Sequence, residues 1–194
     1  MADPLAIEAK VSQVSWTAAD FMLDCPPLVF RLLEPLDSSA IGELYTNGRI
    51  QQFIAPALTK VKAHRRFCAL RDANNSPHPD KLYLSIADKN SNEALGMFAV
   101  FNFAASPARC EFGIMLTEKA QGRGVARHAL SAILSHMQQH LGIVQIFCEI
   151  HQQNLAAQRL ARQCQLRVVD QSYAHTENNL RYVLDQPIRP WLMP

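Results

Sequence analysis

The sequence is poor in several features that mark particular classes of protein. Glycine occurs only seven times in 194 residues, which excludes a collagen-like repeat or a long glycine-rich linker. No apolar run approaches the roughly 20 residues that a membrane-spanning helix needs. The N-terminal residues Met1–Pro4 do not begin a basic region followed by an apolar one, as a secretory signal would. We therefore expect a cytoplasmic protein that has no membrane partner.

An excess of charge of one sign is also lacking. The chain has 19 basic and 17 acidic side chains, a net charge of +2 with neutral histidines. Because broad nucleic-acid binding relies on many unopposed cations, we expect no nucleic-acid partner. The length suits one domain. We predict an N-terminal extension over residues 1–26, a domain over residues 27–186 and a C-terminal tail over residues 187–194.

Cysteine is too scattered for a metal cluster or a redox motif. The five cysteines are an odd number, and no two lie within four residues of each other, which excludes C-x-x-C arrangements. His136 and His140 have the spacing of a zinc-binding pair on a helix, but Met137 stands where such a motif needs glutamate. We therefore predict no metal. Cys68 lies between Phe67 and Ala69, and Cys148 follows Phe147; we predict that the cysteines, Cys68 among them, are small buried side chains.

The hydrophobic pattern alternates between the periods of strands and helices. It predicts a mixed α/β sheet (α+β), in which an antiparallel meander of three strands is followed by one βαβ crossover around a long helix. The predicted strands cover residues 27–33, 81–87, 94–103, 109–116, 143–150, 166–169 and 180–184. The predicted helices cover residues 38–45, 49–54, 60–73, 122–140 and 155–164.

The most informative segment is Gln121–Ala126, which lies between a predicted strand and the long helix. The first turn of a helix has unpaired N–H groups and a positive dipole end, and Gly122 and Gly124 would let a ligand approach the backbone. Together these features predict a phosphate or pyrophosphate site, although a plain strand-to-helix turn would use the same glycines. Arg127 replaces the third glycine of a dinucleotide fingerprint, and the Gly-Lys-Ser/Thr of a P-loop is absent.

The order Gln121, Gly124, Ala126 resembles the Gln/Arg-x-x-Gly-x-Gly/Ala loop that binds the coenzyme A pyrophosphate in the GNAT acetyltransferase superfamily. The preceding strand, Glu111–Leu116, is similar to the splayed fourth strand of that family, and Asn154 matches its pantetheine-contacting asparagine. Phe30–Leu36 and Glu93–Met97 resemble segments of the ribosomal-protein N-terminal acetyltransferase branch. The resemblance covers roughly residues 28–185.

This resemblance implies a GNAT-like fold, with a central splayed sheet flanked by helices, and an acetyl-CoA-dependent N-acetyltransferase. The co-substrate would be acetyl-CoA, and the acceptor an amine, either the N-terminal α-amine of a peptide or protein or a small amine. Dimerisation is common in such folds, so a homodimer is kept as an option. The cofactor-binding residues implied are Met115, Leu116, Gln121, Gly122, Arg123, Gly124, Val125, Ala126 and Asn154.

Within this reading, Glu111 is the candidate catalytic base, because on an ideal strand it shares a face with Arg109 near the expected thioester. An ion pair between these two residues is the structural alternative. Glu149 and His151 are weaker candidates. A backbone N–H near Met115 or Leu116 would stabilise the oxyanion. Tyr173, in a predicted loop, is a candidate proton donor for the leaving thiolate.

Several positions depart from the pattern of the family. Ala161 stands where many relatives have a tyrosine that acts as general acid, and His128 and Gln165 also differ from the usual residues. Ala157 stands where relatives commonly have serine or alanine, and it carries no hydroxyl group. These departures keep open the alternative of a non-catalytic acyl-CoA-binding module. A basic face at residues 60–71 is either solvated or a docking surface for an acidic partner. It consists of Lys60, Lys62, Arg65, Arg66 and Arg71.

Overall fold

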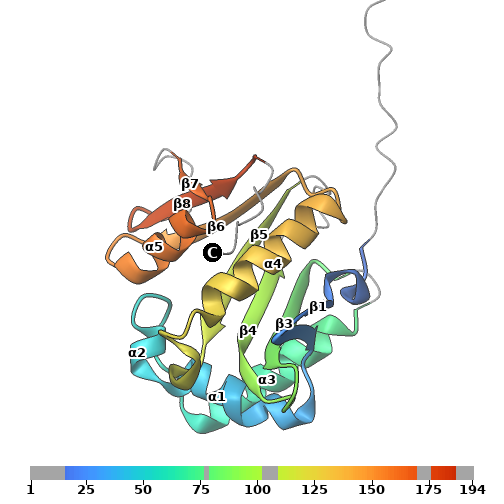
Figure 1. The fold of residues 1–194 in the computed structure, drawn as a ribbon. Helices are drawn as coiled ribbons and strands as arrows, with labels where there is room; N and C mark the ends of the chain where they lie inside the picture. Colours follow the sequence, from blue (N-terminus) through green and yellow to red (C-terminus); the bar gives the residue numbers. More distant parts are fainter. Residues whose placement is uncertain (1–15, 77–78, 102–108, 170–175, 187–194) are drawn as a thin grey trace, which may run out of the picture.

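The computed structural model of the chain describes residues 16–76, 79–101, 109–169 and 176–186. The described residues form one sheet with helices on both faces (Figure 1), and this sheet has eight strands where the sequence predicts seven. The strands are β1 (Leu23–Cys25), β2 (Leu28–Leu32), β3 (Lys81–Asp88), β4 (Ala94–Phe101), β5 (Arg109–Leu116), β6 (Gln145–His151), β7 (Arg167–Val168) and β8 (Asn179–Leu184). The helices are α1 (Ser38–Thr46), α2 (Gly48–Gln51), α3 (Lys60–Asn74), α4 (Val125–Gln139) and α5 (Leu155–Gln163), and three 3-10 turns are η1 (Ala18–Phe21), η2 (Pro35–Asp37) and η3 (Glu118–Ala120).

The predicted meander and crossover are both confirmed. The strand order across the sheet is β1-β2-β3-β4-β5-β6-β8-β7, and β3, β4 and β5 pair in antiparallel fashion. β5 and β6 are parallel, and α4 connects them. β5 has the predicted bounds, while β4 is described as far as Phe101, and residues 102–103 of the predicted strand lie outside the described residues.

The sheet divides in its middle, between β5 and β6. These two strands pair only where Arg109–Glu111 faces Gln145–Phe147. Beyond this short stretch β5 remains paired with β4 up to Leu116, whereas β6 remains paired with β8 up to His151. The two halves of the sheet therefore separate towards the C-terminal ends of β5 and β6.

Two apolar layers cover the two faces of the sheet. One face packs against α4 and α5, with Ile133, Leu134 and Met137 of α4 fully buried, and α4 lies in front of β4 and β5 in Figure 1. The opposite face packs against α1 and α3 through a smaller cluster that includes Leu44 and Phe67. Because neighbouring side chains of β5 alternate between faces, Glu111 and Met115 lie on the α1–α3 face.

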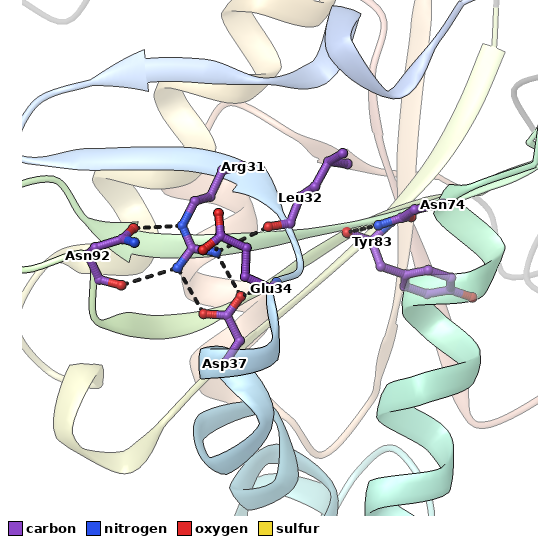
Figure 2. Close-up of polar contacts among 7 residues, drawn as sticks. All are labelled: Arg31, Leu32, Glu34, Asp37, Asn74, Tyr83 and Asn92. Carbon is purple, nitrogen blue, oxygen red and sulfur yellow. Dashed lines mark hydrogen bonds and ion pairs between the residues drawn. The ribbon is translucent and has the colours of Figure 1, made fainter.

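Two polar clamps fix α1 and α3 to the sheet (Figure 2). The Arg31 guanidinium donates two parallel hydrogen bonds to the Asp37 carboxylate, 2.7 and 2.9 Å long. It also donates to the side chain and backbone oxygens of Asn92, and to the backbone oxygen of Leu32, so all five donors are used. Hydrogen bonding to Asp37 raises the pKa of the Arg31 guanidinium above its ordinary value.

The second clamp joins the end of α3 to β3. The Asn74 side chain donates to the backbone oxygen of Tyr83 at 2.7 Å and accepts from its backbone N–H at 2.9 Å (Figure 2). The Asn74 side chain thus supplies the two hydrogen bonds that a neighbouring strand would otherwise make with the backbone of Tyr83. The clamp sets how the side chains of α3 lie against Tyr83.

Three expectations about the local structure need correction. A short strand, β1, lies inside the segment predicted as an extension, and Trp16 and Phe21 are buried against the core; the boundary at residue 26 itself stays a prediction. α4 begins at Val125 rather than at Gly122. Cys68 is exposed, because its sequence neighbour Phe67 takes the inward position of α3 and consecutive helical residues point to different sides.

The other cysteines fit the expectation better. Cys110, Cys148 and Cys164 are buried, and Cys25 is half-buried. Burial raises the pKa of the Cys110 thiol to about 12, so this thiol is protonated at neutral pH. In the part of the chain that the structure describes, no helix is long and apolar enough to span a membrane.

Candidate active site

The loop before α4 is held open by two glycines in the left-handed region. Gly122 has a φ of +70° and Gly124 a φ of +78°, and a Cβ added to either would meet no atom within 4 Å. The space next to Gly122 and Gly124, on the side where a Cβ would point, therefore holds no protein atoms. Gln121, Arg123 and both glycines are exposed, whereas Val125 and Ala126 are half-buried.

The N-terminus of α4 has no side-chain cap, because glycine occupies the N-cap position. By contrast, the side chain of Thr59 caps α3 and that of Asn154 caps α5. The first bond within α4 runs from the His128 N–H to the Gly124 oxygen, so the N–H groups before His128 have no partner inside the helix. The positive end of this 15-residue helix is thus directed at the open side of the loop.

The end of β5 presents a backbone N–H to the gap in the sheet. The Thr117 N–H donates to the Leu95 oxygen of the β4 side at 2.9 Å. Because an antiparallel ladder alternates, the N–H of Met115 points towards β4 and that of Leu116 points away from it. The Leu116 oxygen, on the same side, accepts a 3.0 Å hydrogen bond from the Gln121 side chain.

A cavity of about 360 Å³ occupies the gap between the two halves of the sheet. Glu111 and Met115 line it from β5, and Asn154 lines it from the start of α5. These three predicted residues are therefore brought together. Leu116 and the loop Gln121–Ala126 are not part of the cavity lining and lie beyond the end of β5.

Asn154 combines a structural contact with a place on the cavity wall. Its side-chain oxygen accepts from the Ala157 N–H at 3.1 Å, which caps α5. Its amide nitrogen forms no hydrogen bond with any other described residue. This nitrogen can therefore donate to a ligand in the cavity without loss of the cap.

Glu111 lies where the two halves of the sheet meet. It faces Phe101 of β4 and Phe147 of β6 in the strand register, and it is half-buried. The guanidinium carbons of Arg109 and Arg181 lie 4.7 and 4.6 Å from the centroid of the Phe147 ring. Glu111 thus lies at the narrow end of the gap, opposite the ring that both guanidinium groups contact.

The two weaker base candidates also line the cavity, but both are engaged in other contacts. Glu149 accepts a 2.8 Å ion-pair hydrogen bond from Arg181, and each of these side chains is only 8% exposed. His151 accepts at Nδ1 from the Gln153 N–H at 3.2 Å, so that nitrogen is not available as a base. The His151 ring also stacks on Phe53, with 5.4 Å between ring centroids.

No proton donor comes from the middle of α5. Ala157 and Ala161 line the cavity; the resemblance would place serine or alanine at the first position and a tyrosine at the second. Tyr173, the other candidate donor, lies outside the described residues. Within the described ranges, no group of three or more metal-binding side chains comes together.

The sequence did not point to the residues that line the α1–α3 side of the cavity. They come from five different elements or loops and show no common spacing. Tyr45 and Tyr83 are partly buried, and burial raises the pKa of both phenols. The group consists of Tyr45, Phe53, Ile54, Arg66, Tyr83 and Phe101.

Comparisons with known proteins agree with this arrangement. The model of a family described as Acetyltransferase (GNAT) domain matches residues 27–167. A search of curated protein sequences gives no significant match. Among solved structures, an acetyltransferase from Agrobacterium tumefaciens strain C58 superposes with a TM-score of 0.70 at 19% identity, over 85% of this chain and 94% of that chain.

Two further structures have the same fold. A ribosomal L7/L12 α-N-protein acetyltransferase in complex with coenzyme A has a TM-score of 0.69 at 15% identity, over 84% of this chain and 97% of that chain. A spermidine N-acetyltransferase from Vibrio cholerae, in complex with coenzyme A and spermine, has a TM-score of 0.65 at 17% identity, over 81% and 95%. The structural likeness establishes the shared fold, and the family match covers most of the sequence. The chain therefore belongs to the GNAT acetyltransferase family.

Proposed function

We propose that this protein transfers the acetyl group of acetyl-CoA to an amine, and that the N-terminal α-amine of a peptide or protein is favoured over a small amine. The observation that carries the proposal is the divided sheet. Its gap holds a cavity with Glu111 on one wall and Asn154 on another, next to an uncapped helix terminus. A cofactor with a long neutral arm and a pyrophosphate would suit these two adjacent features.

In this proposal the loop Gln121–Ala126 binds the pyrophosphate. The N–H groups at the start of α4 and the positive end of the helix would hold the anion, and Gly122 and Gly124 leave room for it. Asn154 would donate its amide nitrogen to the pantetheine arm in the gap, which Met115 and Leu116 border from β5. No metal takes part.

Glu111 is the proposed general base. The amine must lose its positive charge before it attacks the thioester carbon, and a carboxylate on the cavity wall can take the proton directly or through one water. At pH 7, deprotonating an α-amine with a pKa near 8 costs only about 1.4 kcal/mol, whereas a lysine-like amine costs about 4.6 kcal/mol. An α-amine therefore demands less of a single carboxylate.

The Leu116 N–H is the proposed oxyanion donor. It points away from β4 into the gap, whereas the Met115 N–H points towards β4. A donor held by a strand costs no reorganisation as the carbonyl oxygen gains charge. When the carbon–sulfur bond breaks, the thiolate would take its proton from water, because the α5 wall carries alanines at positions 157 and 161.

Calorimetric titration of acetyl-CoA, followed by thiol release with a panel of peptides and amines, tests the proposal. We expect Glu111→Gln to lower kcat by about 10²- to 10⁴-fold while acetyl-CoA affinity stays unchanged. Glu118→Gln is the matched control, since this exposed carboxylate of η3 lies outside the cavity lining. Absence of acetyl-CoA binding at millimolar concentration, or a Glu111→Gln variant as active as the wild type, would refute the proposal.

A non-catalytic acyl-CoA-binding module is the second candidate function. The observation that favours it is the absence of a hydroxyl group at Ala157 and Ala161, which face the cavity. This candidate predicts acetyl-CoA binding without thiol release across the whole panel. Turnover that Glu111→Gln reduces would exclude it.

A further inference from the structure

One cation of the basic face predicted on α3 lines the cavity. Arg66 lines the cavity, whereas Lys60, Lys62, Arg65 and Arg71 do not. Arg66 precedes the inward-facing Phe67 on the helix, and the Asn74 clamp holds this helix against β3. One cation of the face is thus turned towards the acceptor side of the cavity.

The Arg66 guanidinium lies in an aromatic corner between α1 and β3. Its central carbon is 5.9 Å from the centroid of the Tyr45 ring, and its positive charge opposes the rise in the pKa of Tyr45 that burial causes. Because burial raises the pKa of Tyr45 and Tyr83, both phenols keep their protons and do not offset the positive charge. No carboxylate among the described residues forms an ion pair with Arg66.

The carboxylates that line the cavity do not lie next to Arg66. Of the two carboxylates that line it, Glu149 is neutralised by its ion pair with Arg181. Glu111 lies on the β5 side, where the amine is proposed to lose its proton. The α3 side of the cavity therefore carries the positive charge of Arg66, and a polyamine would bring a second cation towards it.

The register of the sheet gives the scale of the separation. Tyr83 lies opposite Ala99, and Ala99 lies opposite Gly113, so Tyr83 and Gly113 are two strands or roughly 10 Å apart. Glu111 is two residues further along β5. The α-amine and carboxylate of a free amino acid are joined through one carbon atom, whereas an extended peptide covers roughly 3.3 Å per residue. The separation fits a carboxylate that follows the amine by a few residues.

We propose that Arg66 binds an acidic side chain of the acceptor, and that the acceptor is a peptide with aspartate or glutamate among its second to fourth residues. This inference rests on the proposed acetyl transfer to an α-amine. The planar guanidinium can form two parallel hydrogen bonds with a carboxylate, and Phe53, Ile54 and Phe101 line the apolar remainder of the cavity.

Matched peptides test the inference. C-terminally amidated pentapeptides carry aspartate or asparagine at the second, third or fourth position, and free alanine and spermidine serve as further acceptors. We expect kcat/KM for the best aspartate peptide to exceed that of its asparagine partner about tenfold, mainly through KM, which corresponds to about 1.4 kcal/mol. Arg66→Gln should abolish this ratio, and Arg66→Lys should keep part of it.

Arg65→Gln is the control variant, because Arg65 is the adjacent cation of α3 and is exposed like Arg66, but it does not line the cavity. It should retain the full preference for aspartate. Equal kcat/KM for the two peptides in the wild type, or a preference that survives Arg66→Gln, would overturn the inference. Preferred turnover of spermidine or free alanine would overturn it as well.

Peptide binding to the coenzyme A-loaded protein, measured by fluorescence anisotropy, separates this inference from the proposed reaction. An aspartate preference that Arg66→Gln abolishes, in a protein that acetylates none of the peptides, would support the carboxylate site and refute acetyl transfer. The absence of any preference in binding would refute the carboxylate site, whatever the outcome for turnover.

Discussion

Replacing Gly124 with alanine tests the proposed anion site at its most constrained residue. Gly124 is the N-cap of α4 and has a φ of +78°, a conformation that costs an L-residue about 1–2 kcal/mol. The added methyl group would meet no atom within 4 Å, so no steric clash adds to this cost. The chain can keep the loop and lose stability, or rotate Gly124 and misdirect the N–H groups at the start of α4.

The loss of stability and the loss of acetyl-CoA affinity both arise from the left-handed backbone of residue 124. Their sum should therefore amount to about 1–2 kcal/mol. If the loop relaxes in the free protein, acetyl-CoA affinity should fall about 5- to 30-fold; if it does not, the free energy of unfolding should fall instead. Calorimetry with acetyl-CoA and urea unfolding measure the two terms. Gly124→Asn should lose less than Gly124→Ala, because asparagine tolerates the left-handed conformation better.

Gly42→Ala is the matched control for this experiment. Gly42 lies inside α1, and a Cβ there also meets no atom within 4 Å, but its backbone is helical. Alanine should therefore raise the free energy of unfolding by up to about 1 kcal/mol and leave the acetyl-CoA affinity unchanged. A Gly124→Ala variant with wild-type stability and wild-type affinity would refute the reasoning about the loop.

Two further predictions concern stability. Asp37→Ala should lower the free energy of unfolding by about 3–5 kcal/mol, because it leaves the buried Arg31 guanidinium without its carboxylate; a loss below about 1 kcal/mol in urea unfolding would contradict this. The pKa of Cys110 is raised from 9.0 to about 12 in the folded state, so its contribution is complete below pH 9 and is lost as the pH rises towards 12, by about 1.4 kcal/mol per pH unit. Unfolding at pH 8 and pH 10.5 should show a shallower loss for Cys110→Ala than for the wild type, and equal losses would exclude this linkage.

The sequence predicts best those elements whose signals are local. The alternation of Arg109–Leu116 predicts β5 with its observed bounds. The start of α4 was predicted three residues early, because Gly122 can belong to a helix or to a loop until its φ of +70° is known. β1 has only three residues, too few to show a period.

The α1–α3 side of the cavity, where the acceptor is proposed to bind, could not be predicted for a different reason. Tyr45, Arg66 and Tyr83 belong to α1, α3 and β3, and only the packing of these elements brings them to one cavity. In the sequence, Arg66 is one of five cations on a helix and has no feature that separates it from Arg65. The proposed cofactor loop, by contrast, is six consecutive residues, so the sequence alone suggests its chemistry.

The same difference explains how the fold can separate two tasks. The proposed cofactor contacts lie on β5, on the loop before α4 and at the start of α5, where the gap in the sheet and a helix terminus supply the geometry. The proposed acceptor contacts lie on α1 and α3, which the Arg31–Asp37 and Asn74–Tyr83 clamps fix to the face of the sheet opposite α4 (Figure 2). The clamps lie outside the proposed cofactor loop, and Arg66 belongs to neither of them. A change of the Arg66 side chain should therefore leave that loop undisturbed. Acceptor specificity in this protein is therefore expected to depend on α1 and α3, and cofactor affinity on the start of α4.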